Sequence, residues 1–342
     1  MSGTAGSFLR GPSGGRLAEL GVARRRSPHL ARGWLVRLGS ALLLWLGALA
    51  AQAEESPQQL LERMNRALEQ VEFTGTLVYL HGQDLAALRI THRIKDGNPG
   101  ESMLSLTGPV RALSRHPDGV TCMLPDAAPL TVHKTPGRKS GVLRQVPLDF
   151  ARLRSNYHIG YLGHFRVAGR DTEVVGVLAK DSFRYGYRFY VDEATGLPLK
   201  MDLLTEDEAP IQQLMFTDIA IEGQAEAPIA PPTIAQAPAS ADGGSPWLTG
   251  HLPPGFRVVS DEVLAREDGA TIRQLMLSDG LASLSVYVEP PLDGALQGES
   301  QLGAVSAAGG RLGEHQVTVV GEVPPATARR VLELMDNTPG GS

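Results

Sequence analysis

The chain has 342 residues, of which 32 are basic, 37 are acidic and one is a cysteine. A single cysteine excludes an intramolecular disulfide, so the fold must be stabilised by hydrophobic cores, and the chain is long enough for two of them. The acidic balance argues against a nucleic-acid-binding protein.

The first 53 residues are typical of a secretory signal peptide. An apolar run at 40–49 follows Arg32 and Arg37 and precedes Ala51-Gln52-Ala53, a cleavage pattern of small residues. The run is too short for a membrane-spanning helix, which needs about 20 apolar residues. We expect cleavage after Ala53 and an exported, soluble mature chain. Removing seven arginines and one glutamate leaves 25 basic and 36 acidic residues, a net charge of −11.

Residues 54–222 are predicted to form the first domain, which opens with a helix. Ser56 is a good N-cap, Pro57 suits the first turn, and Gln59 completes a capping box. The apolar residues that follow recur at helical spacing, so one face of the helix should pack on the rest of the domain. Those residues are Leu60, Leu61, Met64, Leu68 and Val71.

Short alternating strands follow the helix, and their short connections leave no room for crossover helices. The pattern therefore predicts an antiparallel meander, with a short helix within 147–157 and a weakly structured basic loop at 125–141. The expected strands are 73–80, 85–94, 101–106, 110–116, 120–124, 161–168, 173–179, 183–191, 197–204 and 211–221.

The strand at 183–191 carries an unusual face. Phe183, Tyr185, Tyr187 and Phe189 alternate with polar residues, so one side of the strand is wholly aromatic. Residues 193–196 form a turn in which Gly196 suits a positive φ. Two interpretations stay open for the face: a hydrophobic core, or the lining of a concavity that holds a lipid or another ligand.

Residues 223–246 are rich in alanine and proline, cannot bury a face and are predicted to be a linker. The second domain is expected at 247–335. Its predicted strands are 257–265, 271–278, 281–289 and 316–323, and a helix begins at Pro324-Pro325. Residues 336–342 read as a frayed tail.

We find no signature of an enzyme, a cofactor site or a metal site. His158 and His164 lie six residues apart beside tyrosines, but no carboxylate stands at usable spacing for metal or acid–base chemistry. Cys122 lies in an apolar strand, where a buried thiol and a reactive or intermolecular thiol are the two alternatives. An exported β protein without a catalytic cluster favours a binding function.

Motifs distributed along the mature chain identify a family resemblance. The chain resembles the RseB/MucB family of periplasmic regulators of the extracytoplasmic stress sigma factor. The matching residues are FTGTLVY at 73–79, RYGY at 184–187, Asp192, TGLPLK at 195–200, Trp247, LPPGF at 252–256, DGLA at 279–282, Ser285-Val286, Glu289-Pro290 and VTVVGEVP at 317–324. The linker and the loop at 125–141 follow no motif of the family.

The resemblance implies an α+β fold that is mostly antiparallel β. The large domain would be an unclosed half-barrel with helices on its concave face, similar to LolA-type lipoprotein carriers, and the small domain a β-sheet with a helix. It further implies a periplasmic protein that binds the periplasmic part of a single-pass anti-sigma factor and shields it from site-1 proteolysis. Lipid or lipopolysaccharide signals would release it, and family members self-associate.

Three functions follow from this reading: an anti-sigma-binding regulator that senses a lipid, a periplasmic carrier of lipoproteins or lipids, and an exported hydrolase, which no visible nucleophile–base pair supports. The second domain discriminates the first two, because a simple carrier does not need it. For the lipid site we predict the face that carries Tyr185, Tyr187 and Phe189, with Leu77 and Tyr79 as companions.

Overall fold

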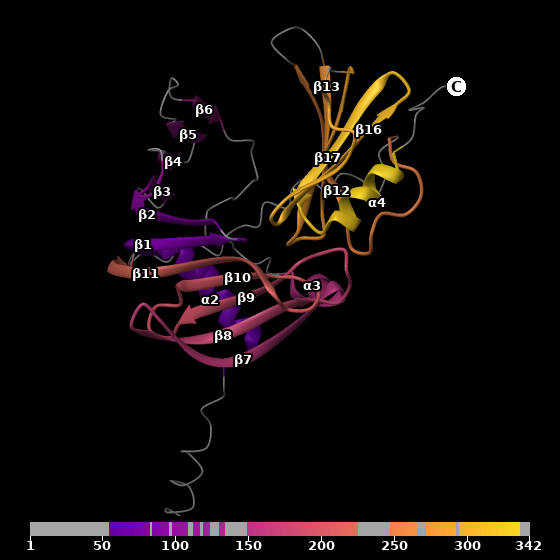
Figure 1. The fold of residues 1–342 in the computed structure, drawn as a ribbon. Coiled ribbons are helices and arrows are strands. Elements are labelled where there is room, and N and C mark those ends of the chain that lie inside the picture. The colour runs from indigo at the N-terminus through magenta and orange to yellow at the C-terminus, as the bar shows by residue number, and fades with distance from the viewer. Residues whose placement is uncertain are drawn as a thin grey trace, which may run out of the picture. The chain divides into compact units, whose positions relative to one another are not determined.

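Figure 1 shows the computed structural model of the chain. It describes residues 55–82, 84–95, 98–108, 112–116, 119–123, 130–133, 149–224, 247–265, 271–291 and 294–335. The predicted signal peptide, most of the predicted linker, the basic cluster of the 125–141 loop and the tail therefore lie outside the described residues, and so does the side chain of Cys122.

The first domain is built on one eleven-stranded sheet. Its order is β6-β5-β4-β3-β2-β1-β11-β10-β9-β8-β7, with antiparallel pairing throughout. Since β6 and β7 are the two ends of this order, the sheet is not closed into a barrel, as expected. The strands are β1 Val71–His81, β2 Asp84–Lys95, β3 Asn98–Ser105, β4 Ala112–His116, β5 Gly119–Met123, β6 Leu130–His133, β7 Tyr157–Val167, β8 Arg170–Ala179, β9 Gly186–Asp192, β10 Pro198–Leu204 and β11 Pro210–Gln224.

Helix α2 (Pro57–Gln70) covers the apolar face of this sheet. The predicted capping box is present: the Ser56 hydroxyl accepts from the Gln59 amide, and the Gln59 side chain accepts from the Ser56 amide. Leu61 and Met64 pack in one core cluster and Leu68 in a second, and Figure 1 shows the helix crossing the face formed by β8, β9 and β10. Val71, predicted on the helical face, is instead the buried first residue of β1.

The short helix α3 (Phe150–Asn156) precedes β7, as predicted, and Asp149 caps it. Six strands of the second domain form another antiparallel sheet, with helix α4 (Pro325–Glu333) packed on it. The sheet order is β12-β13-β14-β17-β16-β15, with strands β12 Arg257–Ala265, β13 Thr271–Ser278, β14 Ser283–Glu289, β15 Gly298–Leu302, β16 Val305–Leu312 and β17 His315–Glu322.

Three strands were not predicted, and strand β9 begins later than expected. Strand β6 falls in the loop expected to be weakly structured, and the β15–β16 hairpin was missed. Strand β15 is exposed along its whole length and lacks an apolar face, so no alternating pattern marks it. Because β9 starts at Gly186, Phe183 and Tyr185 lie in the preceding turn and not in the strand.

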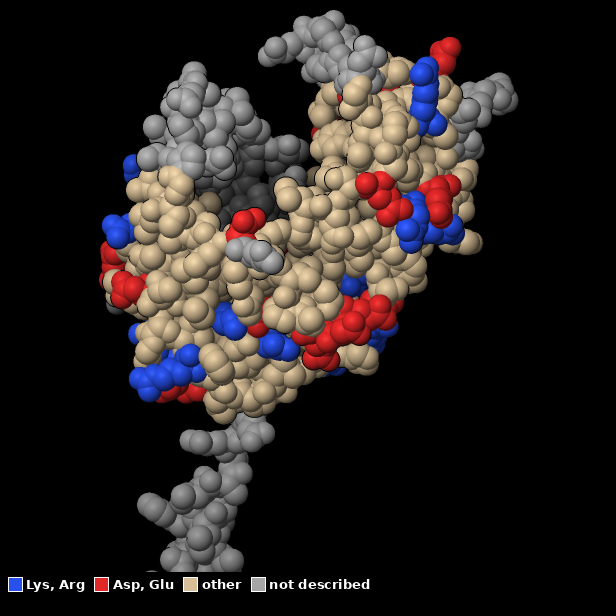
Figure 2. Space-filling model, viewed as in Figure 1, with Lys and Arg blue, Asp and Glu red and all other residues tan. Residues whose placement is uncertain are grey.

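Charged side chains of both signs are mixed on the described surface. On the face seen in Figure 2, acidic and basic residues lie next to one another in small groups. Several of these neighbours form ion pairs, such as Arg93 with Glu222 at 2.6 Å and Arg329 with Glu299 at 3.0 Å.

Gly75 gives a test of the β1–β11 pairing. A Cβ at this position would lie 2.7 Å from the Asp218 carbonyl oxygen and 2.8 Å from the Phe216 ring. Gly75→Ala is expected to lower the free energy of unfolding by about 1–3 kcal/mol, because the sheet has to shift to make room. The matched control is Gly223→Ala on β11, where nothing lies within 4 Å of the new Cβ. Urea denaturation followed by circular dichroism measures both, and equal midpoints would contradict the packing described.

Candidate functional site

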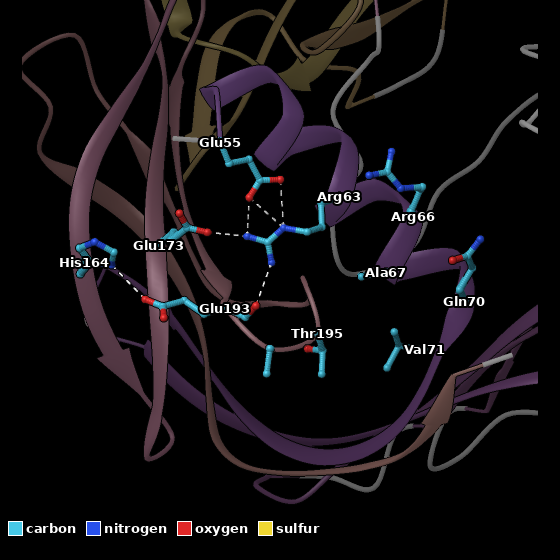
Figure 3. A pocket seen from close by; sticks show the side chains of 11 residues that line it. Glu55, Arg63, Arg66, Ala67, Gln70, Val71, His164, Glu173, Glu193 and Thr195 are labelled. Atoms are coloured by element: carbon cyan, nitrogen blue, oxygen red, sulfur yellow. Dashed lines mark hydrogen bonds and ion pairs between the residues drawn. The ribbon is translucent and has the colours of Figure 1, made fainter. Parts of the chain in front are cut away.

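A polar pocket of about 580 Å³ lies between α2 and the turn that joins β9 to β10. Arg63 of α2 lies at its centre (Figure 3). Its guanidinium donates to Glu55 at 3.0 Å, to the carbonyl oxygens of Asp192 and Glu193 at 3.2 Å each, and to the Glu173 carboxylate. These contacts engage all three nitrogens of Arg63, which therefore ties α2 to the sheet instead of presenting a free cation to a ligand.

The turn at the pocket wall is held by a buried carboxylate. Asp192 accepts two hydrogen bonds of 2.8 Å from Arg170 and two more from Thr195. Burial alone raises the pKa of Asp192, but the bonds from Arg170 and Thr195 outweigh it, so the pKa lies below its usual value. Gly196 has φ +80°, which confirms the positive φ predicted for this turn. A Cβ there would also lie 2.9 Å from Arg63, which is a second reason for a glycine at this position.

His164, on strand β7, does have a carboxylate partner. Its Nδ1 lies 2.9 Å from Glu193, and the Tyr161 hydroxyl lies 2.7 Å from its Nε2. The sequence spacing hid this partner, because Glu193 lies 29 residues away, in the turn that follows β9. The His164 side chain is 68% exposed. The array is therefore solvated and lacks the water-excluded setting in which acid–base chemistry gains strength.

The strand registers place four of the five predicted lipid-binding residues on one face of the first sheet. Phe189, Met201, Leu214 and Tyr79 are consecutive cross-strand partners over β9, β10, β11 and β1, so their side chains share a face. In the adjacent rows, Tyr187 pairs with Leu203 and Leu77 pairs with Phe216.

The fifth predicted residue, Tyr185, reaches the same region from the turn before β9. Tyr185, Tyr187, Phe189 and Leu77 are all buried, and Tyr79 is partly buried. These residues are thus part of the hydrophobic core in this structure. Contact between them and a lipid stays a prediction.

The second domain covers one end of this aromatic face. Leu281 and Ala304, from two of its turns, belong to the same apolar cluster as Tyr185, Tyr187 and Phe189. Polar contacts accompany them. The Tyr187 hydroxyl donates to Glu322 at 3.1 Å, and burial together with the nearby Glu322 charge raises the pKa of Tyr79. The ring of His81 lies against Gly303, where a Cβ would overlap the imidazole.

A buried ion pair fixes this contact between the domains. The side chains of Arg184 and Asp279 are both fully buried and are paired with each other. Arg184 also donates to Asp181 at 2.9 Å and to the Pro254 carbonyl oxygen, and its guanidinium lies 5.1 Å from the Phe256 ring.

The Asp279 carboxylate is saturated as well. It accepts from the Tyr157 hydroxyl at 2.9 Å and from the amides of Leu281 and Ala282 at 2.8 Å each. Such full pairing is what allows two charges to be buried. Burial and the Asp279 charge raise the pKa of Tyr157, which keeps its phenol protonated.

Sequence reasoning missed this ion pair. The alternating pattern placed Arg184 on the polar side of a strand, whereas the structure places it in a turn with its side chain inward. Its partner lies 95 residues away in the other domain. Both residues stand in motifs that carried the family resemblance, RYGY at 184–187 and DGLA at 279–282, and this was the available signal.

The described part of the chain offers no group of three or more His, Cys, Asp or Glu side chains able to hold a metal ion. Nor does any of its helices combine the length and apolarity needed to cross a bilayer.

Comparison with known proteins agrees with this architecture. The model of the MucB/RseB N-terminal domain matches residues 56–235, and that of the C-terminal domain matches residues 241–336. The chain belongs to the MucB/RseB family. The sigma factor AlgU regulatory protein MucB of Pseudomonas aeruginosa is 34% identical over 318 residues, which cover 85% of this chain and 95% of that protein. The sigma-E factor regulatory protein RseB of Escherichia coli K12 is 28% identical, over 87% and 97% of the two chains.

Solved structures of this family are similar over both domains. The complex of Pseudomonas aeruginosa MucA and MucB gives a TM-score of 0.62 at 30% identity, covering 84% of this chain and 99% of that chain. MucB in complex with MucA(peri) gives 0.60 at 31% identity, covering 83% and 98%. The relatives are sigma factor regulatory proteins by name.

The low pKa of Asp192 predicts acid-dependent stability of the pocket wall. A depressed carboxyl pKa contributes stability that is present above the unfolded value of about 3.9 and is lost as pH falls through the lower folded value. Arg170→Gln should therefore lower the free energy of unfolding by roughly 1–2 kcal/mol at neutral pH, with the deficit shrinking as the pH is lowered through the folded pKa. Urea titrations at the two ends of this range measure it. Arg166→Gln, whose exposed pair with Asp171 spans 4.0 Å, is the control. A deficit of equal size at both ends would contradict the role given to Asp192.

Proposed function

We propose that the mature protein is a periplasmic regulator that binds the periplasmic part of a membrane-anchored anti-sigma factor and shields it from site-1 proteolysis. The observation that carries the proposal is the similarity over both domains to a MucB chain solved together with MucA. Export rests on the predicted signal peptide. A regulator of this kind works through its interfaces, and we expect no catalytic activity.

The second domain offers surfaces for such a partner. Strands β12 and β15 end the second sheet, so each presents a row of backbone groups that an extended segment can pair with. Large apolar side chains accompany both edges: Val263 is 62% exposed on β12, and Leu302 is 77% exposed at the end of β15. We place the anti-sigma contact on this domain and along the junction between the domains.

Release of the partner is proposed to follow binding of a lipid or a lipopolysaccharide-type ligand. The support is the aromatic face that carries Tyr79, Tyr187 and Phe189, together with the family resemblance. Burial of an acyl chain contributes roughly 0.8 kcal/mol per CH₂, so such a face can bind a lipid without a charged anchor.

The second candidate function is a periplasmic carrier of lipoproteins or lipids. It accounts for the first domain alone. The second domain, with its own core and its polar contacts to the first, favours regulation over simple carriage.

Capture of the cognate anti-sigma periplasmic segment tests the proposal. The wild-type chain should retain the segment and protect it from the site-1 protease. Val263→Asp or Leu302→Asp should weaken retention about tenfold or more, because binding would then remove an unpaired carboxylate from water at the interface.

The matched control is Leu85→Asp on β2 of the first domain, because Leu85 is 64% exposed and as apolar as the edge residues. Equal retention by all three variants would remove the contact from these edges. Absence of retention and of protection by the wild type would refute the regulator.

A further inference from the structure

The aromatic face of the first domain has two covers of different strength. Helix α2 contributes Leu60, Leu61 and Met64 and is tied down by the saturated Arg63. Among the described residues, the second domain contributes only Leu281 and Ala304 to the same apolar cluster. The apolar part of the interdomain contact is therefore small, and the second domain is the weaker of the two covers.

Polar contacts hold the weaker cover in place. The Arg184–Asp279 pair, the bond from Tyr157 to Asp279 and the bond from the Thr327 hydroxyl to the Phe183 carbonyl oxygen at 2.7 Å all cross the junction. Each of these groups finds a substitute partner in water when the domains part, whereas apolar groups do not. The contact is specific but can be exchanged for hydration.

A fatty-acyl chain has the chemistry to take the place of this cover. It carries more CH₂ groups than Leu281 and Ala304 offer together, and it would contact the same rings of Tyr187 and Phe189. These two rings stack on each other with centroids 5.9 Å apart, so a chain that reaches one ring is also close to the other.

We propose that the turns around Leu281 and Ala304 are a displaceable cover, and that an acyl ligand and the second domain compete for the same aromatic floor. This inference rests on the proposed lipid sensing and specifies how a lipid signal reaches the interface with the anti-sigma factor. Ligand binding and domain separation are then linked, so the apparent affinity for the acyl chain equals the intrinsic affinity multiplied by the open fraction.

The test combines fluorescence titration with cis-parinaric acid, a fluorescent fatty acid, and hydrogen exchange of the full mature chain. Saturation with the probe is expected to speed exchange of the Leu281 and Ala282 amides, because both residues are buried and the Asp279 carboxylate to which they donate is held by Arg184 and Tyr157 of the first domain. Arg184→Met removes the buried ion pair and should bind the probe about tenfold more tightly, because the open fraction rises. Tyr157→Phe removes a single bond and should give a smaller gain in the same direction.

Arg329→Gln is the control variant, because the Arg329–Glu299 pair is exposed and lies within the second domain. It should bind the probe as the wild type does. Tyr157→Phe changes one hydroxyl only and keeps the test decisive should Arg184→Met fail to fold.

The outcomes separate the inference from the function on which it rests. Probe binding with unchanged exchange at Leu281 and Ala282, and with equal affinities of the wild type and Tyr157→Phe, overturns the competition while leaving lipid sensing in place. No probe binding by the wild type or by either junction variant refutes lipid sensing itself. Retention of the anti-sigma segment is measured separately and is unaffected by either result.

Discussion

The apolar core on the first sheet is completed by side chains of the second domain, and the junction between the domains follows from this constraint. Helix α2 packs Leu60, Leu61 and Met64 on this core. The turns of the second domain add Leu281 and Ala304 to the same cluster, in which Tyr185, Tyr187 and Phe189 lie.

The contact between the two domains depends on the buried ion pair of Arg184 and Asp279. A fully buried arginine needs partners for its charge and its nitrogens, and each of the three nitrogens of Arg184 has one: Asp181, Asp279 and a carbonyl oxygen. Such a pair defines one closed arrangement of the two domains, because small displacements would leave charges unpaired. It also makes the closed state reversible, since both charges regain hydration on opening. A larger apolar junction would have joined the domains permanently.

The residues that first suggested catalysis or ligand capture have a structural explanation. Arg63 looks like an anion-binding group at the centre of a pocket, but its contacts with carboxylates and carbonyl oxygens leave it as a tie between α2 and the sheet. His164 has the partners of a catalytic histidine in a solvated setting.

The sequence by itself determined the elements whose signals are local. Ser56 and Gln59 predict the helix start, Gly196 predicts the turn, and alternation predicts β12 and β13 at their observed bounds, because caps, turns and period-two patterns act over a few residues. Only the tertiary structure decided what the aromatic stripe faces. The direction of Arg184 and its pairing with Asp279 depend on a contact 95 residues away, and Tyr187 shares its apolar cluster with turns of another domain. No local pattern carries that information, because the free energy that fixes it arises only when the two domains meet.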